Sequence, residues 1–368
     1  MFVRGTGFEP GEEVSLEIAA ILVGTTIAAS DGNIDTSLTV PPGVTSPILV
    51  TALGKTSDRL AFSTFALALG GTGPPGPSDS APPPSDASIP PPPPAAAKIL
   101  FYSNVEPGSD ETDNEIYTVD PVTLEIGEPL THNDVEDTFP TWSPDHSQIA
   151  FARGKPGDRD IYVMDANGGS ARELVTGSTD DWFPAWSPDG TTIAFVRGTD
   201  GAQIWIVRDS EPPEVLGDPP PGRYLRSPAW APDGSGLAVW GDPDEADNDD
   251  LYFLHLNGTL QRLTADPVVD RNPSWSPDGR MLAFVRDRGE SGSADNDIWT
   301  MDVTTGALLQ LTDNDVQDGN PVWSPDGTQI AFYRATGDGF HIRVLGTDAT
   351  STDLMDGRAG RNLDPNWR

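Results

Sequence analysis

The chain has 368 residues, of which 57 are acidic and 22 are basic, and its formal net charge is −35 at pH 7. A surface this acidic repels the phosphates of nucleic acids and anionic lipids, so neither is an expected partner. Cysteine is absent, which excludes disulfides, thiolate metal ligands and thiol nucleophiles. No apolar run reaches the length of about eighteen residues that a membrane-spanning helix needs, and no signal peptide is visible.

Residues 1–70 are predicted to form a small β-domain. Apolar and polar residues alternate at 14–18 and 33–40, as in half-buried strands, and further strand-like segments follow at 48–53 and 60–69. The Gly-Thr-Gly-Phe-Glu-Pro-Gly-Glu stretch at 5–12 resembles the opening of Ig-like β-sandwich modules of bacterial surface proteins. The resemblance implies an Ig-like module without its first strand, so we expect the chain to begin inside a longer precursor. The alternative is a plain spacer.

A proline-rich linker is predicted at residues 71–97. Eleven of these 27 residues are proline, and most of the others are Gly, Ser, Ala or Asp. Such a composition cannot form a core and favours extended polyproline II, which could separate two domains by roughly 80 Å. We interpret the segment as a stalk, with a proline-rich ligand for a recognition domain as the alternative.

Residues 98–368 contain a repeat in which the phrase Pro-x-Trp-Ser-Pro-Asp-Gly recurs with small changes. Its tryptophans follow one another at spacings of 44, 44, 45, 48 and 44 residues, and they are Trp142, Trp186, Trp230, Trp275, Trp323 and Trp367. A fixed period in this range, with four short strand patterns in each unit, is typical of a β-propeller. The sequence therefore predicts an all-β fold with four-stranded blades.

The two ends of the repeat region predict how the ring closes. The region opens at Lys98 on a second-strand pattern, and it ends on an isolated inner-strand pattern at 364–367. We expect this C-terminal strand to supply the inner strand of blade 1, which leaves no open edge between blades and sets their number at six.

The repeat is similar to the TolB-like propeller family, whose Trp-Ser-Pro-Asp-Gly signature resembles that of WD repeats. The similarity covers about 270 residues and implies a circular six-bladed β-propeller. Full TolB carries an α/β domain before its propeller, whereas this chain has the Ig-like pattern there. The role of TolB is therefore not implied.

Catalytic and metal motifs are scarce. No Gly-x-Ser-x-Gly elbow occurs, and the four histidines fall at different positions of the repeat, which disfavours a serine hydrolase and a histidine-based metal site. No cofactor is expected. One acidic loop offers a candidate calcium site, with a solvated loop as the alternative, and its carboxylates are Asp242, Asp244, Asp247 and Asp249.

The predicted ligand site is the mouth of the central channel, where the loops entering the six inner strands gather. These loops present carboxylates, arginines and aromatic rings, which are typical of a surface that binds peptides or sugars. The alternative is a set of salt bridges between loops. The candidate residues are Asp137, Asp181, Trp182, Tyr224, Arg226, Asp270, Arg271, Asp318 and Arg361.

Three functional hypotheses follow. The first is a monomeric, non-catalytic protein of the bacterial cell envelope or exterior that binds a protein, peptide or glycan at the channel mouth. The second is a lyase, hydrolase or peptidase-like propeller that uses the rim carboxylates Asp137, Asp181, Asp270 or Asp318 as acid and base. The third is a purely structural surface element.

Overall fold

A computed structural model describes the propeller and the strands of the N-terminal region. The described residues are the strands within 2–65 and the segments 98–104, 114–199, 201–209, 211–217, 223–242, 248–287, 296–346, 351–355 and 360–367. The chain divides into two compact units, one of residues 1–95 with 347–350 and the other of residues 96–346 with 351–368. The predicted linker at 71–97 lies outside the described residues, apart from its boundary at Lys98.

The N-terminal unit contains two antiparallel sheets. One pairs β1 (Phe2–Gly5) with β4 (Ile34–Ser37). The other has the order β3-β2-β5-β6 and comprises β2 (Glu13–Ile18), β3 (Ile21–Ile27), β5 (Ile48–Gly54) and β6 (Leu60–Phe65). Strands β2, β4, β5 and β6 overlap the predicted strand segments, whereas β1 and β3 were not predicted. The assignment to the Ig-like fold stays a prediction.

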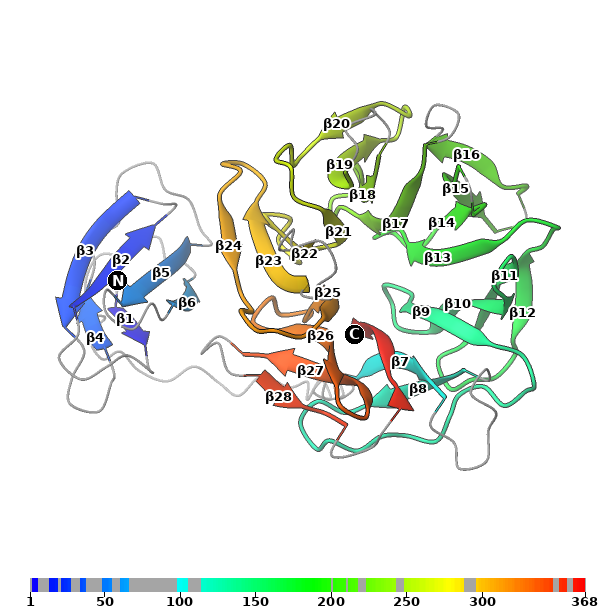
Figure 1. The fold of residues 1–368 in the computed structure, drawn as a ribbon, viewed down its shortest axis with the longest axis horizontal. Coiled ribbons are helices and arrows are strands. Elements are labelled where there is room, and N and C mark those ends of the chain that lie inside the picture. The colour runs from blue at the N-terminus through cyan, green and yellow to red at the C-terminus, as the bar shows by residue number, and fades with distance from the viewer. Residues whose placement is uncertain are drawn as a thin grey trace, which may run out of the picture. The chain divides into compact units, whose positions relative to one another are not determined.

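The second unit is a six-bladed β-propeller, as the repeat predicts (Figure 1). Its inner strands carry the Pro-x-Trp phrase and are β9 (Asp137–Trp142), β13 (Asp181–Trp186), β17 (Leu225–Trp230), β21 (Asp270–Trp275), β25 (Asp318–Trp323) and β30 (Leu363–Trp367). The second strands are β7 (Ile99–Ser103), β10 (Gln148–Lys155), β14 (Thr192–Arg197), β18 (Gly236–Gly241), β22 (Met281–Asp287) and β26 (Ile330–Thr336).

The outer half of each blade is more exposed. The third strands are β8 (Glu115–Val119), β11 (Asp158–Asp165), β15 (Gln203–Arg208), β19 (Asp250–His255), β23 (Asn296–Asp302) and β27 (Gly339–Leu345). The outermost strands are β12 (Arg172–Val175), β16 (Glu214–Gly217), β20 (Leu260–Arg262), β24 (Leu308–Gln310) and β28 (Ser351–Asp353). In blade 1 an isolated bridge between Val119 and Ile126 stands at the outermost position, and in blade 6 β29 (Gly360–Arg361) adds a short parallel pairing to β27.

The C-terminal strand closes the ring, which confirms the sequence prediction. Strand β30 pairs antiparallel with β7, so that Trp367 lies opposite Ile99 (Figure 1). The Ser103 hydroxyl donates a hydrogen bond of 2.8 Å to the Asn362 side chain, and the Trp142 amide of blade 2 donates one of 3.0 Å to the Asn366 side chain. Blade 1 is thus built from both ends of the propeller unit.

The core lies between the blades. The second strands are almost completely buried, and five of them place a phenylalanine at the same buried position, namely Phe101, Phe151, Phe195, Phe284 and Phe332. Indole groups join neighbouring blades: Trp230 donates 3.1 Å to the Ala185 carbonyl, and Trp275 donates 3.1 Å to the Ala229 carbonyl. Trp230 and Trp275 thus link neighbouring blades, which gives these two repeated tryptophans a structural role.

The Ser-Pro-Asp-Gly phrase forms a tight turn after three of the inner strands, and Ala-Pro-Asp-Gly takes its place in blade 4. In blade 5 the Ser276 hydroxyl donates 2.6 Å to Asp278, and the amide of Gly279 donates 2.9 Å to the Ser276 carbonyl. The turn needs a left-handed residue, and Gly279 supplies it with φ +71°. In blade 2 His146 takes this position with φ +58°, so its departure from glycine preserves the turn.

Candidate binding site at the channel mouth

Four of the predicted rim carboxylates are fully buried in ion pairs within their own blades. Each begins an inner strand and accepts two hydrogen bonds from an arginine that lies sixteen residues later, on the second strand. The N–O distances lie between 2.6 and 2.8 Å, and the pairs are Asp137–Arg153, Asp181–Arg197, Asp270–Arg286 and Asp318–Arg334.

This geometry corrects the expectation that these aspartates present free carboxylates at the rim. All four have no exposed surface, and both oxygens of each are bonded to a guanidinium. Burial raises the pKa of Asp181 and Asp270, and the adjacent arginines oppose that rise. A buried pair of this kind leaves neither oxygen open to a ligand. Each pair joins two strands of one blade, whereas the stated alternative was a set of salt bridges between loops.

Blades 1 and 4, which face each other across the ring, lack this ion pair. In blade 1 the neutral Ser103–Asn362 hydrogen bond takes its place. In blade 4 Leu225 lies opposite Gly241, and a side chain at Gly241 would meet the Tyr224 carbonyl oxygen at 2.1 Å. The chain thus shows three solutions to the same position, one charged, one polar and one apolar.

Six residues with left-handed backbone form a ring that surrounds the channel. One lies on each inner strand, directly before the proline of the repeat phrase. Their φ values run from +46° to +54°, and none is glycine; they are Phe139, Phe183, Ser227, Asn272, Asn320 and Asp364. The inner strands shift register against the second strands at these positions, so each residue lies in a β-bulge. Because the same conformation recurs in every blade, it is a structural feature of the repeat.

The ring is apolar on one side and polar on the other. The rings of Phe139 and Phe183 lie 4.2 Å apart between centroids. The Ser227 hydroxyl donates 3.2 Å to the Asn272 side chain, and Asn272 in turn donates to the Asn320 side chain. These contacts join adjacent blades around the channel.

Asp364 has an unusual ionisation within this ring. Burial raises the pKa of its carboxyl from 3.8 to about 7, and a hydrogen bond with Tyr102 opposes the rise only in part. Burial also raises the pKa of Tyr102, so the phenol keeps its proton. Tyr333, whose hydroxyl accepts 3.1 Å from the Gln317 side chain, is the second phenol near this carboxyl.

We predict that Asp364 makes one contribution to the pH dependence of stability and that Asp364→Asn removes this contribution. Because the carboxyl has a higher pKa in the folded chain than in the unfolded chain, the folded state binds more protons between about pH 4 and pH 7. The contribution of Asp364 to stability is therefore largest at acidic pH and is lost as the pH rises through about 7. Thermal unfolding of both proteins at a series of pH values measures the difference. Parallel pH profiles of the melting temperature would contradict the assignment.

Trp182 forms the centre of an array of arginine and aromatic side chains at the mouth. Its indole donates 3.3 Å to the Gly198 carbonyl and stacks on Phe183 with centroids 4.8 Å apart. The guanidinium carbons of Arg159 and Arg226 lie 5.7 and 5.4 Å from its ring centre. Two cations therefore contact one indole, an arrangement stabilised by cation–π attraction.

The array continues through blades 4 and 5. The Arg226 guanidinium lies 4.7 Å from the Tyr224 ring centre and 5.6 Å from that of Trp240, and the Arg271 guanidinium lies 5.3 Å from Trp240. Arg271 donates 2.6 Å to Asp249, which also accepts from the Tyr224 hydroxyl. Burial and this bond raise the Tyr224 pKa to about 12, so its hydroxyl stays a donor.

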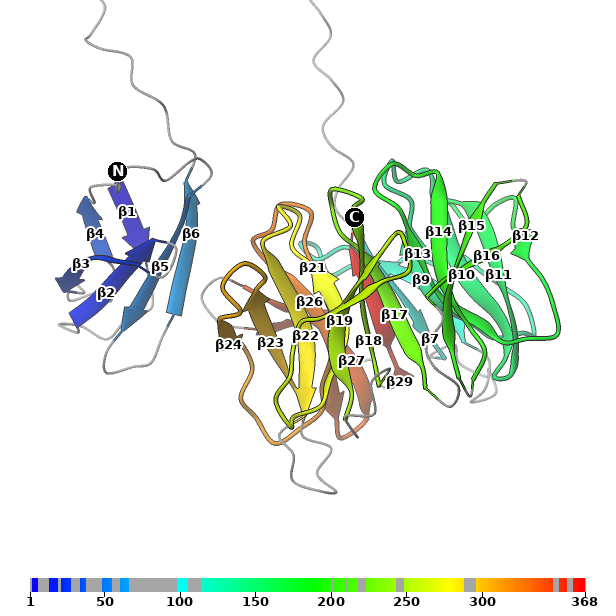
Figure 2. The same ribbon diagram turned by 90° about the horizontal axis from the view of Figure 1, so that it is seen from above.

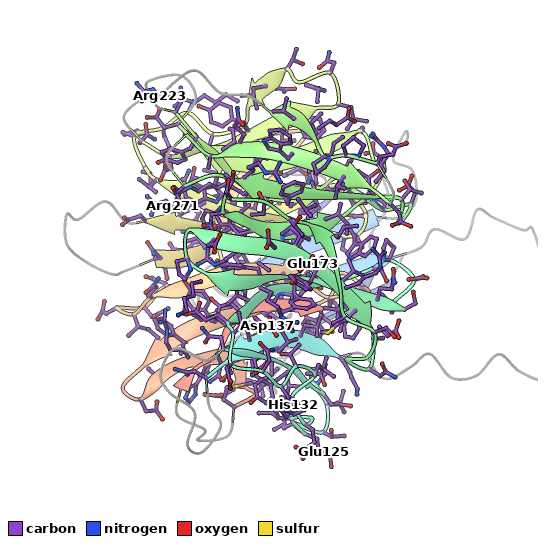
Figure 3. The ribbon with its side chains drawn as sticks, turned by 90° about the vertical axis from the view of Figure 1, so that its right-hand side faces the viewer. Glu125, His132, Asp137, Glu173, Arg223 and Arg271 are labelled. Carbon is purple, nitrogen blue, oxygen red and sulfur yellow. The ribbon has the colours of Figure 1, made fainter. Side chains whose placement is uncertain are left out.

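The structure thus brings four of the predicted site residues together, namely Trp182, Tyr224, Arg226 and Arg271. Arg223 and Arg271 lie toward the same face of the disc (Figure 3), and the blade strands run between its two faces (Figure 2). Arg361 is exposed on β29, where its amide donates 3.1 Å to Asn104, and no contact joins it to this array.

The acidic loop proposed for calcium is described only at its ends. Asp242 forms an ion pair with Arg223, and Asp249 is occupied by Tyr224 and Arg271. Asp244 and Asp247 lie outside the described residues. Within the described segments, no group of three or more acidic, histidine or cysteine side chains is placed to hold a metal ion.

The comparisons with known proteins bear on this fold. The family model described as the TolB beta propeller domain matches residues 100–215 and 222–367. The chain belongs to the TolB β-propeller family. A search of curated proteins found no match to this TolB-family chain.

Solved structures share the fold of this TolB-family chain at low identity. TolB from Acinetobacter baumannii is 16% identical with a TM-score of 0.61, over 96% of this chain and 82% of that one. A putative TolB from Agrobacterium tumefaciens is 20% identical with a TM-score of 0.56, over 73% and 92%. Hydrazine synthase from Kuenenia stuttgartiensis is 13% identical with a TM-score of 0.60, over 74% and 47%. Identities this low show a shared fold alone.

Proposed function

We propose that this chain is a non-catalytic, monomeric binding protein of the bacterial cell envelope or exterior, and that its channel mouth holds a protein or peptide segment. The observation that carries the proposal is the position of Trp182 between the guanidinium groups of Arg159 and Arg226, beside Tyr224. Aromatic and arginine side chains are the residues most enriched at the centres of protein interfaces. Membership of the TolB propeller family supports the same class of function.

The burial of the four rim carboxylates supports a non-catalytic role over the enzymatic alternative. General acid–base chemistry needs a carboxyl that reaches the substrate, whereas Asp137, Asp181, Asp270 and Asp318 are buried and bonded to arginine through both oxygens.

No helix among the described residues is long and apolar enough to cross a membrane.

The proposal predicts that the chain selects peptides through Trp182. We expect a phage-displayed library of random twelve-residue peptides to yield sequences that bind the full chain, and Trp182→Ala to bind them at least tenfold more weakly. The indole supplies both the buried apolar contact and the surface on which two arginines rest. Fluorescence anisotropy with the synthesised peptides measures both affinities.

The matched control is Trp205→Ala, because Trp205 lies on the third strand of the same blade and makes a cation–π contact with Arg197 at 4.6 Å. It removes an indole from blade 3 away from the mouth. Selection of no peptide, or equal binding by Trp182→Ala, would refute the proposal. We expect mass spectrometry to recover the bound peptides uncleaved, and their hydrolysis would favour the enzymatic alternative.

A further inference from the structure

The guanidinium groups at the channel mouth differ in how their charge is balanced. Arg159 donates 3.2 Å to Asp180, Arg271 donates 2.6 Å to Asp249, and Arg223 forms an ion pair with Asp242. Arg226 forms no ion pair with any described residue. Its Nη2 donates 3.2 Å to the Thr199 carbonyl, and this is its one hydrogen bond to the described part of the chain.

The position of Arg226 is costly unless something else binds it. Its Nε is buried and has no hydrogen-bond partner among the described residues, and a buried polar group in that state destabilises the fold. Three aromatic rings, those of Trp182, Tyr224 and Trp240, surround the guanidinium at 4.7 to 5.6 Å and fix its direction. The aromatic rings thus fix the direction of the cation, and no carboxylate among the described residues neutralises it.

The charge of the whole chain narrows the class of ligand. With a net charge of −35, the protein repels polyanions such as nucleic acids, so a single negative group is the species that gains from one uncompensated guanidinium. A carboxylate matches the planar fork of arginine through two parallel hydrogen bonds. The surrounding aromatic rings suit an apolar side chain beside that carboxylate.

We propose that Arg226 is the specificity-determining residue of the channel mouth and that it binds a carboxylate of the peptide segment, either an Asp or Glu side chain or a chain terminus. This inference rests on the proposed function and deepens it, because it names the chemical group that the site selects. Arg159, Arg223 and Arg271 already have carboxylate partners, so they orient the array and do not compete for the ligand.

The experiment uses the three tightest peptides from the selection described above, synthesised with a fluorescent label. Each Asp or Glu is replaced by Asn or Gln, and each peptide is made with a free and an amidated C-terminus. For at least one of these changes we expect affinity for the wild type to fall tenfold or more. The same change should alter affinity for Arg226→Gln less than twofold. In that variant the interaction between the guanidinium and the carboxylate is already absent, so removal of the carboxylate has no further effect.

Two further variants complete the test. Arg172 lies on β12 and forms an exposed ion pair with Asp209. Arg172→Gln removes this positive charge and should bind every peptide as the wild type does. Arg226→Lys keeps the charge without the fork and should bind with intermediate affinity. A coupled side-chain change identifies an internal acidic residue, and a coupled amidation identifies a terminus.

The outcomes separate the inference from the proposed function. Peptides that depend on Trp182 but show no carboxylate coupled to Arg226 would overturn the inference and leave the proposed function standing. Failure to select any peptide would overturn both. Equal loss of affinity in Arg226→Gln and Arg172→Gln would assign the effect to overall charge, which also contradicts a role for Arg226 in recognition.

Discussion

Deletion of residues 364–368 is expected to open the ring and to lower the melting temperature by about 10 °C or more. The deletion removes Trp367 from a cluster with Ile99 and Phe101, and loss of a large buried aromatic costs about 3–5 kcal/mol. In a domain of this size each kcal/mol changes the melting temperature by about 2–4 °C. It also leaves β7 with an unpaired edge. Circular dichroism during heating measures the change.

The matched control removes only the residue after β30. A chain without Arg368 keeps Trp367 and the full pairing of β30 with β7, so it should melt with the wild type. An unchanged melting temperature in the five-residue deletion would show that the ring does not depend on this closure. The affinity for the selected peptides should also decrease when the propeller opens, because the channel mouth is formed by all six inner strands.

Arg286→Ser is expected to destabilise the propeller by about 3–5 kcal/mol, the cost of leaving one partner of a buried ion pair alone. Arg286 donates 2.7 and 2.8 Å to Asp270, a carboxylate with no exposed surface. Urea unfolding, followed by tryptophan fluorescence, measures the free energy of unfolding. The exposed pair Arg172–Asp209 offers a comparison, since loss of that arginine should cost less than about 1 kcal/mol.

The neutral pair in blade 1 suggests a second substitution that should restore part of the lost stability. The double variant Asp270→Asn with Arg286→Ser reproduces the neutral Asn362–Ser103 pair, so it should recover at least about 1 kcal/mol of the loss. The single variant should be least stable at alkaline pH, because the isolated carboxyl has a raised pKa and the folded state then favours its protonated form. A double variant as unstable as the single one would show that lost packing, and not the unpaired charge, causes the effect.

The blade architecture was predictable because one phrase recurs at one period. The strands fall where the repeat predicts them, and the closing pair of β30 with β7 follows from the unmatched patterns at the two ends. Hydrophobic patterning fixes such elements locally, and the ring then follows from the number of repeats. The bridge at Val119 and Ile126 was not predicted, since the outermost strand has the weakest pattern.

The candidate site was predictable only in part. The pairing of Asp137 with Arg153 had a sequence signal, because an arginine follows sixteen residues after the aspartate in blades 2, 3, 5 and 6. Phe139, Arg159 and Trp240 had no such signal. Their contacts with Trp182 and Arg226 join different blades, and distances across blades depend on the closed ring.

The calcium candidate in the acidic loop stays a prediction, because Asp244 and Asp247 lie outside the described residues. Asp242 and Asp249 looked like calcium ligands because seven of nine residues at 242–250 are acidic or asparagine. Their arginine partners are Arg223, which lies two residues before β17, and Arg271 on β21, so the neutralising charges are distant in sequence.

The closing strand also has a consequence in time. Ser103 and Asn362 are 259 residues apart, so blade 1 cannot form until the other five blades have left the ribosome. A contact of such sequence separation closes late and slowly, since loop-closure entropy opposes it before packing rewards it. During synthesis the edge of β7 that later pairs with β30 therefore stays unpaired. This unpaired edge exposes the nascent protein to aggregation and proteolysis.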